Sequence, residues 1–563
     1  MAHLLTPRDA EIRHFHMYCG VGGGALGFNR GQARVGRARA HMRCIGGIDV
    51  DPGAIESFTR LVGVPGTVLD LFDRQQFEDF HGHEPREDWR EATADDIRIA
   101  AHGERPHIIF LSAPCKGFSG LLSGKNARSR KYRALNRCTL RGVRLVLEAW
   151  GDDPPELILF ENVPRIQTRG RAFLDEITDL LDAAGYAVAE TTHNCGELGG
   201  LGQNRQRFLL VARHREKVGP FLYEPPKRPL RTIGEVIGDL PLPGGDDAGL
   251  HRLPRLQWKT WVRLALIEAG SDWRSLEKLE VEDGYLKDLV LVPEYFRGSY
   301  GVQRWDDVSS TVTGRAGPST GRFSVADPRP PRDLGRYEPY GVVDWEDQSR
   351  TVTSQAAPGS GPYSVADPRL DCNASDRRKR RFNNVLRVVR WDNASRCVTG
   401  AGGAKQAIAD PRVGLANGTG YRNGFYGVRR TDAVSGTVTG SARHDNGPWS
   451  VADKRLPAPS EQCRPLIVSL DDTWHRPLTT LELAALQSFP ADLVLASGSD
   501  SECRGWIGNS VPPDSAAAIA SEMAETLLLA WAGQTFQLSA KPIWVLPISI
   551  ALSVATPEEV HRG

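Results

Sequence analysis

Cys115 is the first residue whose surroundings suit covalent chemistry. It follows the apolar run 108–111, which predicts a short buried strand, and Lys116 stands beside it. Glycines at 117 and 120 allow a tight turn that would present the thiol. A thiolate beside a cation can act as a nucleophile. The alternative is a small buried packing residue, as a lone cysteine often is.

Glu161 and two arginines add groups that could move protons or bind anions. The apolar run 157–160 predicts a second buried strand, and Glu161 follows it, where it could cap a helix or donate a proton. Arg205 and Arg207 alternate before a strand expected at 208–212, which would place both on one face. There they could hold a phosphate or a base edge, or simply pair with acids.

A glycine-rich stretch and two acids near the N-terminus indicate a nucleotide-like ligand. Residues 20–24 contain four glycines between an expected strand and a helix start, which lets the backbone approach a ligand closely. No Gly-Lys-Ser/Thr follows, so this is not a P-loop. The next two apolar runs end at Asp49 and Asp70, where carboxylates can bind ribose hydroxyls. One adenosine-binding crevice is the economical interpretation, and three unrelated surface turns are the alternative.

The stretch 116–137 carries seven lysines and arginines and no acid. Because it follows Cys115 directly, we predict a mobile flap that closes over phosphates. A solvated basic loop is the alternative, since charge runs usually are that.

The composition of the chain limits its class. Its 563 residues favour two or three domains, and 40% hydrophobic with 25% charged residues are typical of a soluble globular protein. A net charge of +1 confines any nucleic-acid-binding face to a local patch. Nine cysteines without a CxxC pair argue against zinc, so no metal is expected, and fit a reducing cytoplasm. No signal peptide is expected, and the apolar run 543–555 is too short to span a membrane.

In this order, the motifs resemble those of the cytosine-C5 DNA methyltransferases, over about residues 14–213 and 474–530. The first matches are the cofactor and nucleophile motifs, and the last two lie near the C-terminus. The matching stretches are Tyr18-x-Gly20-x-Gly22-Gly23, Asp49, Asp70, Pro114-Cys115 with Ser119, Glu161-Asn162-Val163, Gln203-x-Arg205-x-Arg207, 476-RPLTTLELAALQSFP-490 and 508-GNSVPP-513.

This resemblance implies a site for S-adenosylmethionine and a reaction at cytosine C5. Cys115 would add to C6 of a cytosine flipped out of the duplex, while Glu161 binds N3 and the exocyclic amine. Arg207, with Arg205 as a further candidate, would hold the O2 edge and the target phosphate. Asn509 would brace the nucleophile turn. The implied cofactor-binding residues are Tyr18, Gly20, Gly22, Gly23, Asp49, Asp70 and Asn509.

Three positions depart from the family pattern. Tyr18 stands where the family commonly has phenylalanine, Ala113 where it has a second proline, and Lys116 where it has glutamine. A tyrosine can still stack on adenine. Lys116 changes the polarity beside the nucleophile, but no reacting residue is lost.

Four similar units lie between the two motif blocks. Their Thr-Val-Thr cores start at 311, 351, 397 and 437, the third with Cys397 in the first place. This spacing of about 40 residues indicates repeats, and two apolar runs around a polar loop predict strand, loop and strand in each. In one interpretation all the loops read base edges. In the other the units form a stacked scaffold, and the last unit, 426–454, sets specificity.

We therefore predict an α/β fold with a doubly wound, mostly parallel sheet of the Rossmann-like S-adenosylmethionine-dependent methyltransferase type. A β-rich target-recognition domain built from about four repeats would accompany it. The predicted domains are a catalytic lobe at 1–213, the recognition domain at 214–473 with repeats at 295–330, 335–370, 381–413 and 421–455, a return to the catalytic lobe at 474–535, and a tail at 536–563.

The predicted function is methylation of cytosine C5 in a specific duplex DNA sequence. The alternatives are a non-catalytic DNA-binding relative, or the same chemistry on structured RNA, which a large repeat insert disfavours. Double-stranded DNA is the expected partner, with a cognate restriction endonuclease as a further candidate and no membrane. The expected location is cytoplasmic, in a bacterium or encoded by a phage, near the nucleoid.

Overall fold

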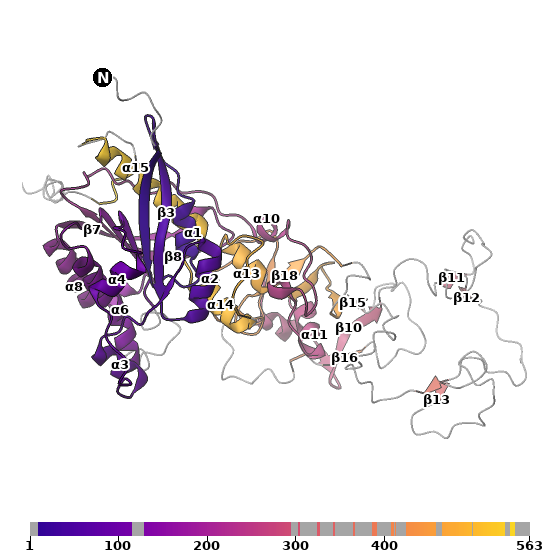
Figure 1. The fold of residues 1–563 in the computed structure, drawn as a ribbon. Helices are drawn as coiled ribbons and strands as arrows, with labels where there is room; N and C mark the ends of the chain where they lie inside the picture. Colours follow the sequence, from indigo (N-terminus) through magenta and orange to yellow (C-terminus); the bar gives the residue numbers. More distant parts are fainter. Residues whose placement is uncertain are drawn as a thin grey trace, which may run out of the picture. The chain divides into compact units, whose positions relative to one another are not determined.

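The computed structural model places most of the predicted motifs in a well-formed first unit (Figure 1). The chain divides into two compact units, with residues 1–279, 411–464 and 471–563 in the first and 280–410 and 465–470 in the second. The described residues are 9–114, 129–293, 302–304, 324–326, 342–343, 364–365, 385–390, 407–409, 411–412, 424–457, 464–497, 499–534 and 541–545. Cys115, Lys116 and Ser119 lie outside them.

An eight-stranded mixed sheet forms the centre of the first unit. Its order is β2-β3-β1-β5-β6-β8-β7, and β4 pairs with β3. The pairs of β1 with β3 and β5, of β3 with β4 and of β5 with β6 are parallel, whereas β8 is antiparallel to β6 and β7. The strands are β1 Asp9–Met17, β2 Arg34–Val35, β3 Ala38–Asp49, β4 Thr67–Val68, β5 Ile108–Leu111, β6 Leu157–Asn162, β7 Tyr186–Asn194 and β8 Gln206–His214.

Helices cover both faces of this sheet, as a doubly wound fold requires (Figure 1). Ile109 and Leu111 of β5 pack with α4, α6 and α8, while Ile108 and Phe110 pack with α1, α9 and α15. Both sides of the strand are apolar because both are buried. The helices are α1 Gly23–Asn29, α2 Pro52–Val62, α3 Arg74–His81, α4 Ala94–Ala100, α6 Arg130–Ala149, α7 Ile166–Arg169, α8 Arg171–Ala183, α9 Cys195–Gly199 and α15 Pro513–Trp531.

A further core in the same unit joins the last repeat to the C-terminal motifs. Val438, Val451, Leu481 and Ile507 belong to it. β17 is parallel to β18, and β18 is antiparallel to β20. The elements of this part are α10 Ile233–Ile237, η1 Gly249–His251, α11 Trp258–Leu266, η2 Trp273–Lys278, β17 Val428–Arg430, β18 Ser450–Asp453, β20 Trp474–Pro477, α13 Thr480–Leu486 and α14 Asp500–Asn509.

Arg476 holds two carboxylates inside this part of the chain. Its Nη2 lies 2.7 Å from Asp453 Oδ2 and 2.7 Å from Glu482 Oε1, and its Nη1 donates to Glu482 Oε2 at 2.8 Å. Glu482 also accepts from Thr479 N, which caps α13. Burial opposes ionisation, yet the charge of Arg476 holds the pKa of Glu482 and Asp453 below their ordinary values.

The second unit contains a sheet in which β10 pairs with β9, β15 and β16, and β15 pairs with β19. Two short parallel pairs, β11 with β12 and β13 with β14, belong to the first two repeats. The strands are β9 Val281–Glu282, β10 Tyr285–Pro293, β11 Val302–Arg304, β12 Ser324–Ala326, β13 Val342–Val343, β14 Ser364–Val365, β15 Val385–Arg390, β16 Ala407–Ala409 and β19 Leu466–Val468.

Three of the four repeats share one strand pairing. Val302 pairs with Ser324 in the first repeat, and the equivalent valines at 342 and 428 pair with serines at 364 and 450. In the third repeat, β15 and β16 each pair with β10. The predicted strand, loop and strand are therefore observed as parallel pairs in the first, second and fourth repeats. A recognition domain built from them stays a prediction.

Among the helices of the described ranges, none combines the length and the apolar character that crossing a lipid bilayer requires.

Candidate active site

The parallel strands gather polar residues at one edge of the first sheet. Tyr18 follows β1, Asp49 ends β3, Asp70 comes after β4, Ser112 follows β5, and Glu161 lies one residue before the end of β6. Their strands are parallel, so these positions share the carboxyl edge of the sheet. Open α/β sheets bind ligands at this edge.

Glu161 lies at the centre of a small polar group there. Its Oε1 is 2.8 Å from Nε of Arg207, and its Oε2 accepts a hydrogen bond of 2.9 Å from Ser112 Oγ. The side chains of Arg207 and Glu161 are 12% and 9% exposed, so the pair is shielded but not sealed. A carboxylate with one donor on each oxygen still has lone pairs for a ligand. The structure thus brings together Glu161 and Arg207, and it adds Ser112, which sequence reasoning missed.

The segment that leads to Cys115 is anchored at this group. Ser112 N donates to Met17 O at 3.2 Å, which extends the pairing of β1 with β5. Ala113 is buried and Pro114 is exposed. Cys115 itself lies beyond the described residues here, so its role as nucleophile stays a prediction.

The glycine turn after β1 takes backbone conformations that favour glycine. Gly20 and Gly22 have φ angles of 51° and 90°. A side chain at Gly22 would begin 2.6 Å from Val62 Cγ2, and one at Gly23 would begin 2.5 Å from Val511 O. Beside Gly20, in contrast, no atom lies within 4 Å of that position. The turn therefore packs closely on α2 and the C-terminal motif while its first glycine faces open space.

Asp49 is fixed against this turn. Its Oδ2 accepts from Gly20 N at 2.9 Å, and its Oδ1 accepts from Asp51 N at 3.1 Å. Burial raises the pKa of Asp49 above its ordinary value, and these two hydrogen bonds oppose the rise. Asp70 accepts from Phe72 N at 3.0 Å, and the hydroxyl of Tyr18 donates to a backbone carbonyl of α6 at 2.6 Å. All three side chains are thus held in place at the edge.

These residues fit the adenosine part of S-adenosylmethionine. The open space beside Gly20 permits close approach of a ligand to the backbone. Asp49 retains lone pairs for ribose hydroxyls, and Tyr18 supplies an aromatic ring. The carboxylates along this edge also suit a ligand with a positive sulfonium.

Arg205 lies in a different environment from Arg207. Its side chain is buried, with Nη1 donating to Val438 O at 3.1 Å and Nη2 donating to Gly508 O at 3.1 Å and Ser510 O at 2.9 Å. The alternation predicted one shared polar face, but the two guanidinium groups bind different partners. Arg205 joins the last repeat to the C-terminal motif, whereas Arg207 reaches Glu161.

Trp506 is a second residue near this edge of the sheet that sequence analysis did not identify. Its Nε1 donates to Asp51 Oδ2 at 2.8 Å, and Asp51 Oδ1 caps the N-terminus of α2. An acid before Pro52 is a recognisable cap signal, but the bond to α14 spans 455 positions and has no sequence signal. Asn509, predicted to brace the nucleophile turn, is exposed at the end of α14.

The last part of the flap predicted at 116–137 is helical. Residues 130–137 form the first turns of α6, so the prediction of a loop is wrong for these residues. Arg, Lys and Leu are all good helix formers, and the apolar face of α6 packs on the sheet. Residues 115–128 lie outside the described ranges.

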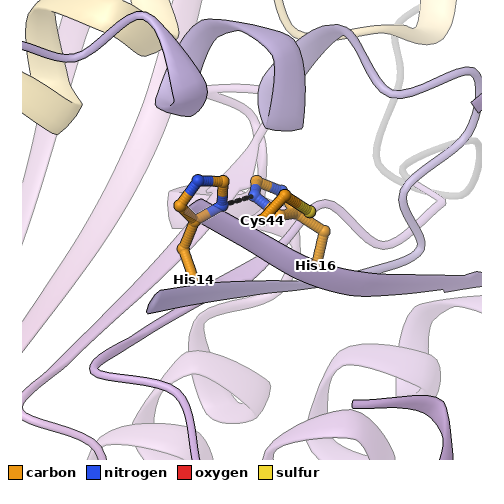
Figure 2. Close-up of side chains that lie close together, drawn as sticks. All are labelled: His14, His16 and Cys44. Atoms are coloured by element: carbon orange, nitrogen blue, oxygen red, sulfur yellow. Dashed lines mark hydrogen bonds between the residues drawn. The ribbon is translucent and has the colours of Figure 1, made fainter. Parts of the chain in front are cut away.

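A buried cluster beneath α1 contains side chains of the types that bind metals (Figure 2). The ligand atoms of His14, His16 and Cys44 lie within 4.8 Å of one another, the one such group within the described ranges. Asn29 Oδ1 accepts from Cys44 N and lies 3.0 Å from His14 Nε2, so that nitrogen carries the proton. His14 Nδ1 then accepts from His16 Nε2 at 2.8 Å.

Burial sets the protonation of these groups. Burial lowers the pKa of His14 to about 3 and that of His16 well below its ordinary value. Burial also raises the pKa of the Cys44 thiol to about 12. The three groups are neutral, and the bonds among them and Asn29 account for their positions. We interpret the cluster as polar packing.

The doubly wound sheet and its acidic, glycine-lined edge define a Rossmann-like α/β fold. The family model for C-5 cytosine-specific DNA methylases matches residues 12–247 and 401–525, well over half of the chain. The chain belongs to this family, whose members methylate cytosine and use S-adenosylmethionine as the methyl donor. A comparison with curated proteins finds no matching sequence.

Similar solved structures include three methyltransferases. EhMeth of Entamoeba histolytica is 10% identical with a TM-score of 0.44, covering 92% of this chain and 98% of its own. Dnmt2 of S. pombe is 14% identical with a TM-score of 0.39, covering 93% and 99%. A Spodoptera frugiperda DNMT2 mutant is 11% identical with a TM-score of 0.43, covering 92% and 99%. The assignment of the chain to the family rests on the family model and not on these structural similarities.

Proposed function

We propose that this protein is a DNA (cytosine-5-)-methyltransferase that modifies a specific sequence of duplex DNA. The observation that carries the proposal is the Glu161–Arg207 pair, 2.8 Å apart at the carboxyl edge of the sheet. On the neighbouring strand, Ser112 binds the same carboxylate three residues before Cys115. A carboxylate and a guanidinium at this edge, at the end of the strand that leads to a cysteine, suit activation of a pyrimidine at C6.

The proposed role of Cys115 is to make C5 reactive. Its thiolate forms a bond to C6 of the cytosine, which turns C5 into an enamine-like carbon. After C5 has taken the methyl group, a base from solvent removes the C5 proton. The electrons of that bond restore the C5–C6 double bond as the C6–S bond breaks, and the thiolate is returned.

Glu161 and Arg207 would act on the opposite edge of the ring. A proton held between Glu161 and N3 neutralises the charge that develops there as the thiolate adds, and the exocyclic amine donates to the same carboxylate. Arg207 keeps the carboxylate in place and faces the O2 edge. Arg205 would act indirectly, because its guanidinium holds backbone carbonyls at 438, 508 and 510.

S-Adenosylmethionine, when bound, supplies an electrophilic methyl group. Asp49 would hold its ribose hydroxyls, Asp70 its adenine, and Tyr18 would stack on that base, while the backbone at 20–23 lies alongside. Asn509 is the further candidate of this set. A cytosine inside a duplex is out of reach of this edge, so the base must be flipped out.

The test is methyl transfer by Cys115→Ser. We expect loss of transfer from labelled S-adenosylmethionine to duplex DNA with DNA binding retained, and transfer retained in the control Cys372→Ser. We also expect the unchanged enzyme to form a covalent adduct with a 5-fluorocytosine duplex. An active Cys115→Ser variant would refute the mechanism, and transfer to transfer RNA but not to DNA would move the substrate to RNA.

We further propose that the region 214–473 recognises the target and that its last repeat sets specificity. That repeat is bound to the segment before β8: Val438 N donates to Gln203 Oε1 at 2.9 Å, and Thr437 Oγ1 donates to Asn204 O at 2.6 Å. It therefore lies beside the strand that carries Arg207. Exchanging residues 426–454 for another repeat should change the methylated sequence, and an unchanged sequence would refute the idea.

The setting of the enzyme is a proposal of the same kind. We expect a cytoplasmic enzyme, bacterial or phage-encoded, that acts near the nucleoid and is accompanied by a cognate restriction endonuclease. Bisulfite sequencing of DNA from expressing cells should find 5-methylcytosine in one sequence context. Protection of that context from one restriction endonuclease encoded beside the gene would support the restriction–modification role.

A further inference from the structure

Ser112 is a residue with no assigned role that touches the proposed reaction centre. It directly follows β5, and its Oγ donates to Glu161 Oε2 at 2.9 Å. The bond follows from the strand register, because Leu111 pairs with Phe160 and the next residues along are Ser112 and Glu161. A serine at this position is thus placed by the sheet itself against the carboxylate.

The backbone of Ser112 is fixed as firmly as its side chain. Its N–H donates to Met17 O at 3.2 Å, and Met17 directly precedes Tyr18 at the end of β1. Ser112 therefore joins three strand ends: the one that leads to the cofactor turn, the one that leads to Cys115, and the one that carries Glu161. Both its backbone and its side chain are therefore tied to neighbouring strands.

The two donors on Glu161 constrain it at both oxygens. Arg207 Nε holds Oε1 at 2.8 Å and Ser112 Oγ holds Oε2 at 2.9 Å. With both bonds in place the plane of the carboxylate is defined, and the lone pairs that remain have fixed directions. With the Arg207 bond alone, the carboxylate could rotate about its last torsion, which is a broad, weakly restricted one.

We propose that Ser112 is a positioning residue that orients the Glu161 carboxylate toward the pyrimidine ring. This inference rests on the proposed function and deepens it. Because hydrogen bonds to charged groups are the stronger ones, we expect Ser112→Ala to lower kcat by about tenfold to a hundredfold. KM for DNA and for S-adenosylmethionine should change little, since the lost bond touches neither ligand.

The experiment is a double-mutant cycle with a rescue. Methyl transfer to duplex DNA is measured for wild type, Ser112→Ala, Glu161→Gln and the double variant. If Ser112 acts through the Glu161 carboxylate, its effect should largely vanish in the Glu161→Gln background. Ser112→Thr keeps the hydroxyl and should restore kcat to within about threefold of wild type. A remaining loss of this size corresponds to the free energy of one weak contact. Ser521→Ala, which removes a hydroxyl that donates to Ala517 O and accepts from Gln32 N, away from Glu161, is the matched control.

Each outcome decides between distinct conclusions. A kcat of Ser112→Ala equal to wild type, or a Ser112→Ala effect of undiminished size in the Glu161→Gln background, would overturn the inference while leaving the proposed function standing. A lowered unfolding midpoint in Ser112→Ala with no rescue by threonine would assign it a structural role instead. A wild-type chain that transfers no methyl group to DNA or RNA would overturn the proposed function and this inference together.

Discussion

Two regions of the first unit pair an arginine with carboxylates, and they differ in what surrounds the pair. At the sheet edge, Arg207 binds one oxygen of Glu161, and the two side chains are 12% and 9% exposed. In the C-terminal core, Arg476 lies between Asp453 and Glu482, whose side chains and its own are at most 2% exposed. A guanidinium–carboxylate pair is thus partly accessible at the sheet edge and fully buried in the C-terminal core.

The two carboxylates differ in accessibility and in the number of their partners. Glu161 retains lone pairs at an edge that a ligand can reach, so its charge remains available. Glu482 accepts from two nitrogens of Arg476 and from the backbone N–H of Thr479, the N-cap residue of α13, so both of its oxygens are hydrogen-bonded. A sealed triad of this kind stabilises only while complete, because removing one partner leaves a buried charge without compensation.

The largest effect on activity is expected for Glu161→Gln at the accessible pair. The amide keeps the size of the side chain and an oxygen for Arg207, but it cannot hold the proton at N3. We expect kcat to fall by about 10²–10⁴-fold, the range for a positioned acid–base group, with an unchanged unfolding midpoint. The matched control is Glu156→Gln at the other end of β6, where the carboxylate binds Arg105. Equal losses of activity in both variants would contradict the assignment of Glu161.

A large loss of stability is expected for Arg476→Met in the buried triad of Arg476, Asp453 and Glu482. Buried Glu482 loses its charged partner and Asp453 keeps only Arg455, so we expect the free energy of unfolding to fall by about 3–5 kcal/mol. Urea denaturation followed by circular dichroism measures it. Arg60→Met, in an exposed pair with Glu56 on α2, is the control and should change stability by less than about 1 kcal/mol. A small effect at Arg476 would show that the triad is no more structural than a surface pair.

The contribution of Arg476 to stability should depend on pH. Arg476 holds the pKa of Asp453 and Glu482 below their ordinary values although burial works against it. Carboxylates with a lowered folded pKa contribute stability above their unfolded pKa of about 4, and that stability is lost as pH falls through the folded pKa. The stability difference between wild type and Arg476→Met should therefore shrink between about pH 6 and about pH 3. Urea titrations at each pH test this, and a difference that grows on acidification would contradict it.

The smallest effect is expected for Asp51→Ala, beside the accessible edge. This change removes the N-cap of α2 and the acceptor for Trp506, and a lost cap costs about 1 kcal/mol. Trp506→Phe removes only the second contact and should cost less. Urea denaturation of both variants gives the order, and a larger loss for Trp506→Phe would assign the main contribution to α14.

The carboxyl edge could be predicted because strand patterns and strand-end residues are local. Asp49, Asp70 and Glu161 each end or follow an apolar run, and parallel strands bring such positions to one edge. The length of the basic flap could not be predicted in the same way. Arg130 and the basic residues after it suit either a solvated loop or the outer face of a helix, and the apolar face of α6 packed on the sheet decides for the helix.

Contacts between segments distant in the sequence could not be predicted either. The Ser112–Glu161 bond needs the register of β5 against β6, which no single motif contains. Arg205 was expected beside Arg207, but it binds backbone carbonyls, and these have no side-chain signature in a sequence. Such bonds depend on where the chain has been folded, not on which residue types it contains.

The contacts of Arg205 can form only late in the synthesis of the chain. One of its acceptors, Ser510 O, lies 305 residues further along the chain, and α15 beyond it covers one face of the central sheet. At ribosomal rates of about 5–20 residues per second, roughly 15–60 s separate the synthesis of the two partners. During that interval the N-terminal half is an unfinished domain with exposed apolar surface. We therefore expect the nascent chain to engage chaperones until α15 has left the ribosome.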